Sequence, residues 1–159
     1  MVADDGWSFD FELTGRGWAQ GTIRAGERST TATASYLKDA LGDLLGATRL
    51  MLADVREARC SWWDEPGEFR WVFTRDGADV RVRIIGFDDL KTGESDVAGT
   101  MLFDETGAPG AVAAAIEEGA RRALERHGEE GYRALWVSDP FPTESLDILA
   151  ERLRAIRTA

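Results

Sequence analysis

Residues 57–85 of the chain read EARCSWWDEPGEFRWVFTRDGADVRVRII, three runs of alternating apolar residues joined by two turn sequences. A four-residue loop at 64–67 and a two-residue type I′ turn at 76–77 convert these runs into two consecutive antiparallel hairpins. In that register the large apolar side chains all fall on one face, as a half-buried antiparallel sheet requires. The predicted cross-strand pairs are Trp62 with Phe69, Cys60 with Trp71, Ala58 with Phe73, Phe73 with Val80, Trp71 with Val82 and Phe69 with Ile84.

The same register gathers four arginines on the opposite face, where Arg70 is expected directly across from Arg83. Like charges opposed across neighbouring strands are destabilising, so this face suggests an acidic partner or an anionic ligand. Glutamates and aspartates on the same face, Glu57, Glu68 and Asp79, allow the competing interpretation of a solvated, cross-paired surface. Aromatic and arginine side chains are enriched in binding hot spots. The candidate interaction surface comprises Arg59, Trp63, Arg70, Val72, Arg81, Arg83 and Ile85.

Length and composition favour one globular unit. The chain has 159 residues, 43% of them hydrophobic, which is enough for a single domain over 1–159 with its own core. Its formal net charge of −10 disfavours binding to nucleic acid and to anionic membrane surfaces. One cysteine, Cys60, and one histidine cannot build a disulfide or a typical zinc site. Residues 1–6 show no basic start and no apolar stretch, so we expect no signal peptide and a cytoplasmic location.

The alternation of residues 7–34 predicts three further antiparallel strands. A three-residue loop that ends at Gly17, with Gly17 in the left-handed region, pairs Phe11 with Gly21. A four-residue turn then pairs Gly21 with Ala32 on the next strand. Because the inward residues of these strands are small, we expect a helix to cover them closely.

Helical periodicity follows in three places, and the segments between them are less regular. The expected helices begin after an N-cap at Ser35, extend over 111–127 up to Gly128, and begin again at Thr143. A further strand is expected over 97–103, and 132–137 is either a strand or the end of a helix.

This order of elements predicts an α+β fold. We expect an antiparallel sheet of six to seven strands with one wet face. One long helix is inserted after strand three, and two C-terminal helices pack on the other face.

Motifs of catalysis are missing from the chain. No serine-nucleophile, phosphate-binding, dinucleotide-binding or zinc-hydrolase pattern occurs. His127 precedes Gly128 and is expected to cap a helix, and Cys60 is expected to be buried. Asp64 and Glu65 lie at an exposed hairpin tip, where their pKa values should be ordinary. The acidic residues Asp88, Asp89, Glu94, Asp96, Asp104 and Glu105 lack EF-hand spacing. We therefore expect no catalytic residue, no cofactor and no metal, and we favour a non-enzymatic protein.

Two stretches, SYLKDALGDLL at 35–45 and EPGEFRW at 65–71, resemble motifs of a family of small uncharacterised actinobacterial proteins. The resemblance covers about the first two thirds of the chain. It implies a source and a length, and it implies no activity, cofactor or catalytic residue.

The leading hypothesis is a cytoplasmic module that binds another protein, or a second copy of itself, through the exposed sheet face. The alternative is a small-molecule-binding or hydrolytic domain. Its pocket would lie between sheet and helices near Gly21, Ala32 and Ala34, where the inward side chains are small.

Overall fold

The computed structural model describes residues 6–90 and 93–158. Residues 1–5, which carried most of the expectation about a signal peptide, lie outside the described part. The chain forms an α+β fold of antiparallel strands and three α-helices. In chain order the elements are β1 (Trp7–Gly15), β2 (Trp18–Ala25), β3 (Arg28–Ser35), α1 (Ala40–Leu52), β4 (Glu57–Trp63), β5 (Glu68–Asp76), β6 (Asp79–Phe87), the short 3₁₀ helix η1 (Asp96–Ala98), β7 (Thr100–Gly107), α2 (Pro109–Trp136) and α3 (Thr143–Thr158).

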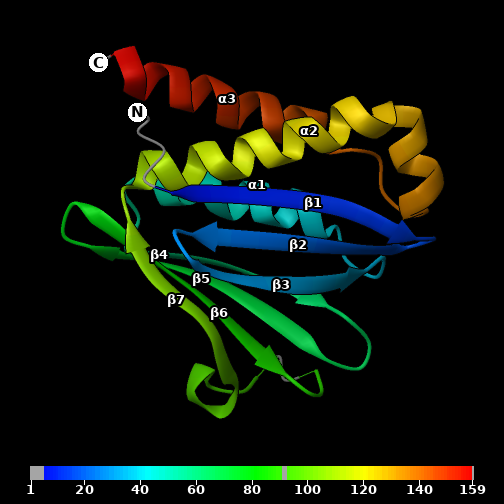
Figure 1. Ribbon diagram of the computed structural model, residues 1–159, viewed down its shortest axis with the longest axis horizontal. Helices are drawn as coiled ribbons and strands as arrows, with labels where there is room; N and C mark the ends of the chain where they lie inside the picture. Colours follow the sequence, from blue (N-terminus) through cyan, green and yellow to red (C-terminus); the bar gives the residue numbers. More distant parts are fainter. Residues whose placement is uncertain (1–5, 91–92, 159) are drawn as a thin grey trace.

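The seven strands form two sheets, with orders β1-β2-β3 and β4-β5-β6-β7, and the prediction of one continuous sheet is wrong. The first sheet lies across the inner face of the second, so the apolar faces of both sheets share one core (Figure 1). Edge-to-face aromatic pairs join the two sheets, with ring centroids about 6 Å apart. These pairs are Trp7 with Phe103 at 6.0 Å, Phe9 with Trp71 at 5.9 Å and Phe11 with Trp62 at 5.9 Å.

The space beside the small inward residues of β2 and β3 is filled by Trp62 rather than by a helix. A Cβ atom built on Gly21 would lie 2.5 Å from the Trp62 ring, so only glycine fits there. Trp62, Ala32 and Ala34 are all fully buried. The ring is held in place because its Nε1 donates a hydrogen bond to Ala40 O at 2.9 Å. The pocket on which the ligand-binding alternative relied is therefore filled by core side chains at this position.

Three of the four predicted hairpin registers are confirmed. Phe11 pairs with Gly21, Gly21 with Ala32 and Trp62 with Phe69, and Gly17 has the expected left-handed φ of 75°. The hairpin between β5 and β6 is shifted by two residues, because its loop is 77–78 instead of 76–77. A shift of two keeps every side chain on its predicted face but changes its partner.

The shifted hairpin corrects the predicted opposition of two arginines. Arg70 lies opposite Ile85, and Arg83 lies opposite Val72. Arg81 lies opposite Thr74. No two arginines therefore face each other across these two strands, and the one like-charged pair among the described positions of this ladder is Asp76 with Asp79, beside the turn.

Two helix boundaries differ from the expectation. Ser35 belongs to β3, and Asp39 caps α1 by accepting a hydrogen bond from Gly42 N at 3.2 Å. Gly128 interrupts α2 with a φ of 69°, but the helix continues to Trp136, so 132–137 is helical in all but its last residue.

The helices enclose the core from one side of the strands. Helix α1 packs against β4 and β5, α2 runs along β1, and α3 lies beside α2 (Figure 1). In the described part of the chain, this arrangement leaves the outer face of β4–β7 without an α-helix over it.

Candidate functional site

The outer face of the four-stranded sheet is the candidate interaction surface, and it is less exposed than predicted. Arg70, Val72 and Ile85 are at most 5% exposed, so the expectation of a wet face is wrong at these three positions. The side chains of Arg59 and Arg81 are 43% exposed. Trp63 and Arg83 are partly buried, which completes the seven candidate residues.

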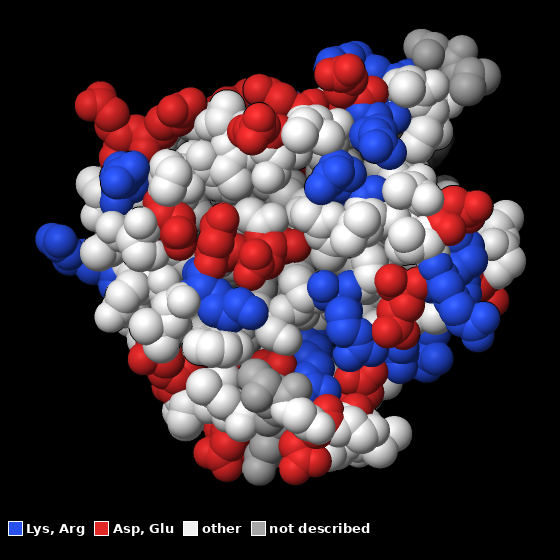
Figure 2. Space-filling view, turned by 180° about the vertical axis from the view of Figure 1, so that it is seen from behind, with Lys and Arg blue, Asp and Glu red and all other residues white. Residues whose placement is uncertain are grey.

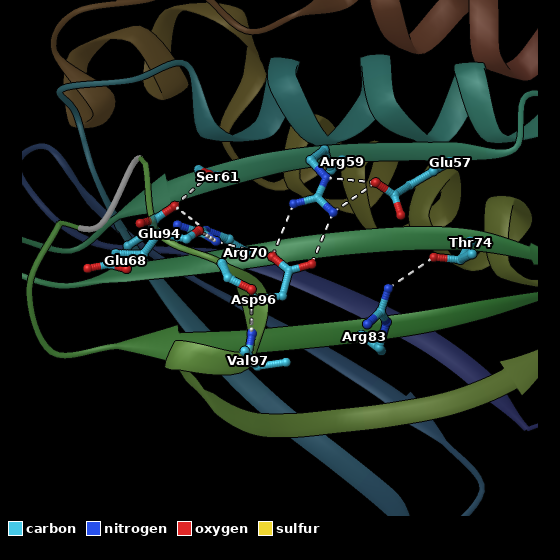
Figure 3. A network of polar contacts seen from close by, with 11 residues as sticks. Glu57, Arg59, Ser61, Glu68, Arg70, Thr74, Arg83, Glu94, Asp96 and Val97 are labelled. Atoms are coloured by element: carbon cyan, nitrogen blue, oxygen red, sulfur yellow. Dashed lines mark hydrogen bonds and ion pairs between the residues drawn. The ribbon is translucent and has the colours of Figure 1, made fainter.

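The cover over this face comes from residues 93–99, which we call the strap. The strap follows β6 and precedes β7 in the sequence, and it contains η1. It crosses the outer side of the sheet (Figure 3). A Cβ atom on Gly99 would lie 2.6 Å from Ile85 and 2.7 Å from Phe87, so the strap packs closely on the sheet here. Ile85, Phe87 and Val72 form an apolar cluster separate from the main core. The strap is the element that sequence reasoning missed, because it has no periodic pattern of its own.

A buried ion pair lies under the strap. Arg70 Nε donates to Glu68 Oε2 at 2.9 Å, and the two side chains are 6% and 1% exposed. Ser61 Oγ also donates to Glu68 Oε2, at 2.8 Å. The Arg70 guanidinium lies 4.2 Å from the centroid of the Phe87 ring. Buried charges are tolerated only when they are paired and hydrogen-bonded, and this pair meets both conditions.

Asp96 ties the strap to two arginines of the sheet. Arg59 donates to both carboxylate oxygens, at 3.1 and 3.0 Å, in a bidentate fork. Arg70 Nη1 donates to Asp96 Oδ1 at 3.1 Å and to Glu94 O at 2.6 Å. The hydrogen bond from Arg59 holds the pKa of Asp96 below its usual value, and Arg70 adds to this effect. Asp96 is therefore charged at neutral pH, and its stabilising effect is lost only as the pH falls below about 4.

Arg81 and Arg83 differ in how they are paired. Arg81 makes a bidentate contact with Asp104, at 2.8 and 2.7 Å. Arg83 Nη2 donates to Thr74 Oγ1 at 3.1 Å, and its buried Nε finds no partner in the part of the chain that the structure describes. Within residues 6–90 and 93–158, no carboxylate lies in ion-pair contact with Arg83. Arg59, Arg70 and Arg81 are thus paired with carboxylates of the chain, whereas Arg83 makes no such close pair among the described residues, although Asp104 lies opposite it on β7.

Charge on the molecular surface is mixed. Seen from behind, basic side chains lie among acidic ones and do not form a single basic patch (Figure 2). One apolar side chain stands out on the strap, since Val97 is 91% exposed. Recognition on this face would therefore depend on individual side chains and not on a broad field.

The remaining candidates contribute little to the site. Burial raises the pKa of the Cys60 thiol far above its usual value, so Cys60 is not a thiolate. Burial also raises the pKa of Asp64, and the expected ordinary pKa at this hairpin tip is wrong. His127 lies directly before the break at Gly128 inside α2. Among the described residues, no group of acidic, cysteine or histidine side chains is placed to hold a metal ion.

A second polar cluster lies where α1 begins and α2 ends. Burial raises the pKa of Asp39 to about 6, and the nearby Asp139 and Asp43 add to the rise. Ser35 precedes α1 in the sequence, and Tyr132 belongs to the last turns of α2. Ser35 Oγ and Tyr132 Oη are both buried and have no hydrogen-bond partner among the described residues. Burial and the same two carboxylates, Asp39 and Asp139, raise the pKa of Tyr132.

Asp39 makes stability depend on pH. Its pKa in the folded chain is above the unfolded value, so the folded state binds more protons and the free energy of unfolding falls as the pH rises from about 4 to about 6. Asp39→Asn keeps a capping side chain and should stabilise the protein at pH 7 by about 1 kcal/mol, a value reduced for partial exposure. Urea unfolding at pH 4 and pH 7 measures this, with Asp54→Asn, at a side chain 92% exposed, as the control. An equal effect of Asp39→Asn at both pH values would contradict the assignment.

Comparison with protein-family models, with curated proteins and with solved structures found no match. None of the helices in the described residues is both long enough and apolar enough to span a membrane.

Proposed function

We propose that this chain is a non-enzymatic protein-binding module, and that its binding surface is the outer face of β4–β7 together with the strap. The observation that carries the proposal is Arg83, a partly buried guanidinium whose Nε has no hydrogen-bond partner and which makes no close ion pair within the described part of the chain. Val97, which is 91% exposed on the strap, offers a partner an apolar contact on the same surface. Arginine is one of the residue types enriched in binding hot spots.

Variants of these two residues test the proposal. Arg83→Ala and Val97→Asp should each leave the fold intact, because neither side chain belongs to the main core. Each should weaken capture of a partner from an extract of the host cells by about tenfold or more. Arg152→Ala, at an exposed arginine of α3, is the matched control and should capture the partner as the unchanged protein does.

Light scattering over a range of concentrations separates the two kinds of partner. A dimer that Arg83→Ala converts to a monomer identifies a second copy of the chain as the partner. A monomer at all concentrations, together with specific capture of another protein, identifies a different chain. If both surface variants capture as much as the unchanged protein, the proposed surface is wrong.

A further inference from the structure

Asp96 is bound in the way that arginine pairs bind the carboxylates of other molecules. Both of its oxygens accept hydrogen bonds from Arg59, and one of them also accepts from Arg70. Planar, two-pronged contact of this kind gives geometric specificity as well as energy. The two arginines lie on neighbouring strands, β4 and β5, so the sheet itself holds them at the spacing that one carboxylate bridges.

We propose that Arg59 and Arg70 form a carboxylate-binding site which Asp96 occupies from within the chain, and that an acidic side chain of a partner protein takes this site when the strap lifts. The inference rests on the proposed function, because it names the chemistry of the partner at the same face. The strap then acts as an internal competitor for its own binding site.

The strap itself contributes few apolar side chains to its contact with the sheet. Six of its seven residues carry no apolar side chain beyond a methyl group, and the seventh is Val97, which points into solvent. Its described polar anchors on the sheet are the Asp96 carboxylate and the Glu94 carbonyl. Segments with few buried contacts open at a small fraction of the global unfolding free energy.

The surface beneath the strap indicates what a partner must carry. When the strap lifts, Ile85 and Phe87 lose the close contact of Gly99. Val72 belongs to the same apolar cluster. A ligand that replaces the strap therefore needs a carboxylate for the two arginines and a neighbouring apolar group for this cluster. An acidic residue within a short extended segment of a protein fits both needs.

The sequence of the strap itself supplies the probe. A synthetic peptide with the sequence of residues 93–99, GESDVAG, carries the carboxylate that occupies the site. In the unchanged protein it must compete with the tethered Asp96, whose effective concentration is in the millimolar range. In Asp96→Ala the internal competitor is gone. The matched control is Asp104→Ala, which removes an equally bidentate carboxylate from Arg81 on the same face without releasing the strap.

Peptide binding is measured by NMR, through the Nε–H signals of the arginines, in buffers of low and of physiological salt. We expect Asp96→Ala to bind the peptide at least about tenfold more tightly than either the unchanged protein or Asp104→Ala. Added salt should weaken this binding. A peptide with asparagine in place of the aspartate should lose it, and so should Arg59→Ala in the Asp96→Ala background. Asp96→Asn, which keeps the side-chain volume, replaces the alanine variant if that variant does not fold.

Equal binding of the peptide to Asp96→Ala and Asp104→Ala would overturn the inference, and so would equal binding of the asparagine peptide. These results are distinguishable from failure of the proposed function. If Arg83→Ala no longer captures the partner and the peptide does not bind Asp96→Ala, the proposed carboxylate site is wrong, but the proposed binding surface is still supported. If the peptide binds as expected while Arg83→Ala and Val97→Asp capture normally, the surface assigned to the partner is wrong.

Discussion

Glu68→Ala should lower the free energy of unfolding by about 3 to 5 kcal/mol, because it leaves the Arg70 guanidinium buried without its closest counter-charge. The two side chains are 1% and 6% exposed, so water cannot replace the lost carboxylate without opening the strap. Ser61 Oγ would lose its acceptor at the same time. The sequence placed Arg70 on a wet face, where the loss of a partner carboxylate would matter much less.

Urea unfolding monitored by tryptophan fluorescence measures the effect. The matched control is Asp104→Ala, which breaks the ion pair of Arg81 on the same sheet face, with side chains 43% and 38% exposed. That variant should lose no more than about 1 kcal/mol, as exposed pairs do. A loss of similar size in both variants would show that the Glu68–Arg70 pair is as accessible to water as the surface pair.

Trp62→Ala should destabilise the protein by about 3 to 5 kcal/mol, as removal of a buried aromatic side chain from a core does. Trp62 is fully buried and lies 5.0 Å from Trp71 and 5.9 Å from Phe11, measured between ring centroids. Its ring fills the space that Gly21 leaves open, so its removal leaves a cavity between the two sheets.

The neighbouring tryptophan is the control for this variant. Trp63→Ala, on the opposite face of the same strand, should cost clearly less, because Trp63 is partly exposed and its best-defined contact is Lys38 Nζ at 5.2 Å from the ring. Thermal unfolding of both variants in parallel compares them. If Trp63→Ala proves the more damaging of the two, the assignment of inner and outer faces on β4 is wrong.

Much of the strand structure could be predicted from alternation alone. Side chains along a strand alternate between faces, so a pattern such as Phe69, Trp71 and Phe73 determines the inner face even when the partner strand is misaligned. For that reason the two-residue shift between β5 and β6 changed the partner of Arg70 without moving its side chain to the other face. The tight turn at Gly17 was predictable because its backbone requires a positive φ.

The division into two sheets could not be predicted in this way. Alternation reports which face of a strand is apolar, but it does not say whether that face meets a helix or a second sheet. The small inward residues of β2 and β3 led us to expect a helix packed against them, but the Trp62 side chain packs there instead. Size complementarity between Gly21 and a tryptophan 41 residues away is a long-range packing effect that no local pattern carries.

The burial of Arg70 was equally invisible in the sequence. The strap that covers it has a polar composition, typical of an exposed loop. Asp96 attaches the strap to Arg59 and Arg70. The distance in sequence between Asp96 and these two arginines gives no sign of the contact. The start of α1 was also misplaced. Ser35 and Asp39 are both good capping residues, but Ser35 pairs with Trp18 of β2 as part of β3, so Asp39 is the N-cap.

The strap closes the outer face of the sheet, and the Asp96 carboxylate is its main side-chain anchor on Arg59 and Arg70. Hydrogen exchange over residues 93–99, compared between the unchanged protein, Asp96→Asn and Asp104→Asn, tests the role of Asp96. We expect exchange at the strap amides, and at the edge of the sheet beneath them, to quicken by at least about tenfold in Asp96→Asn and to stay unchanged in Asp104→Asn. Strap exchange that is the same in all three proteins would contradict the claim.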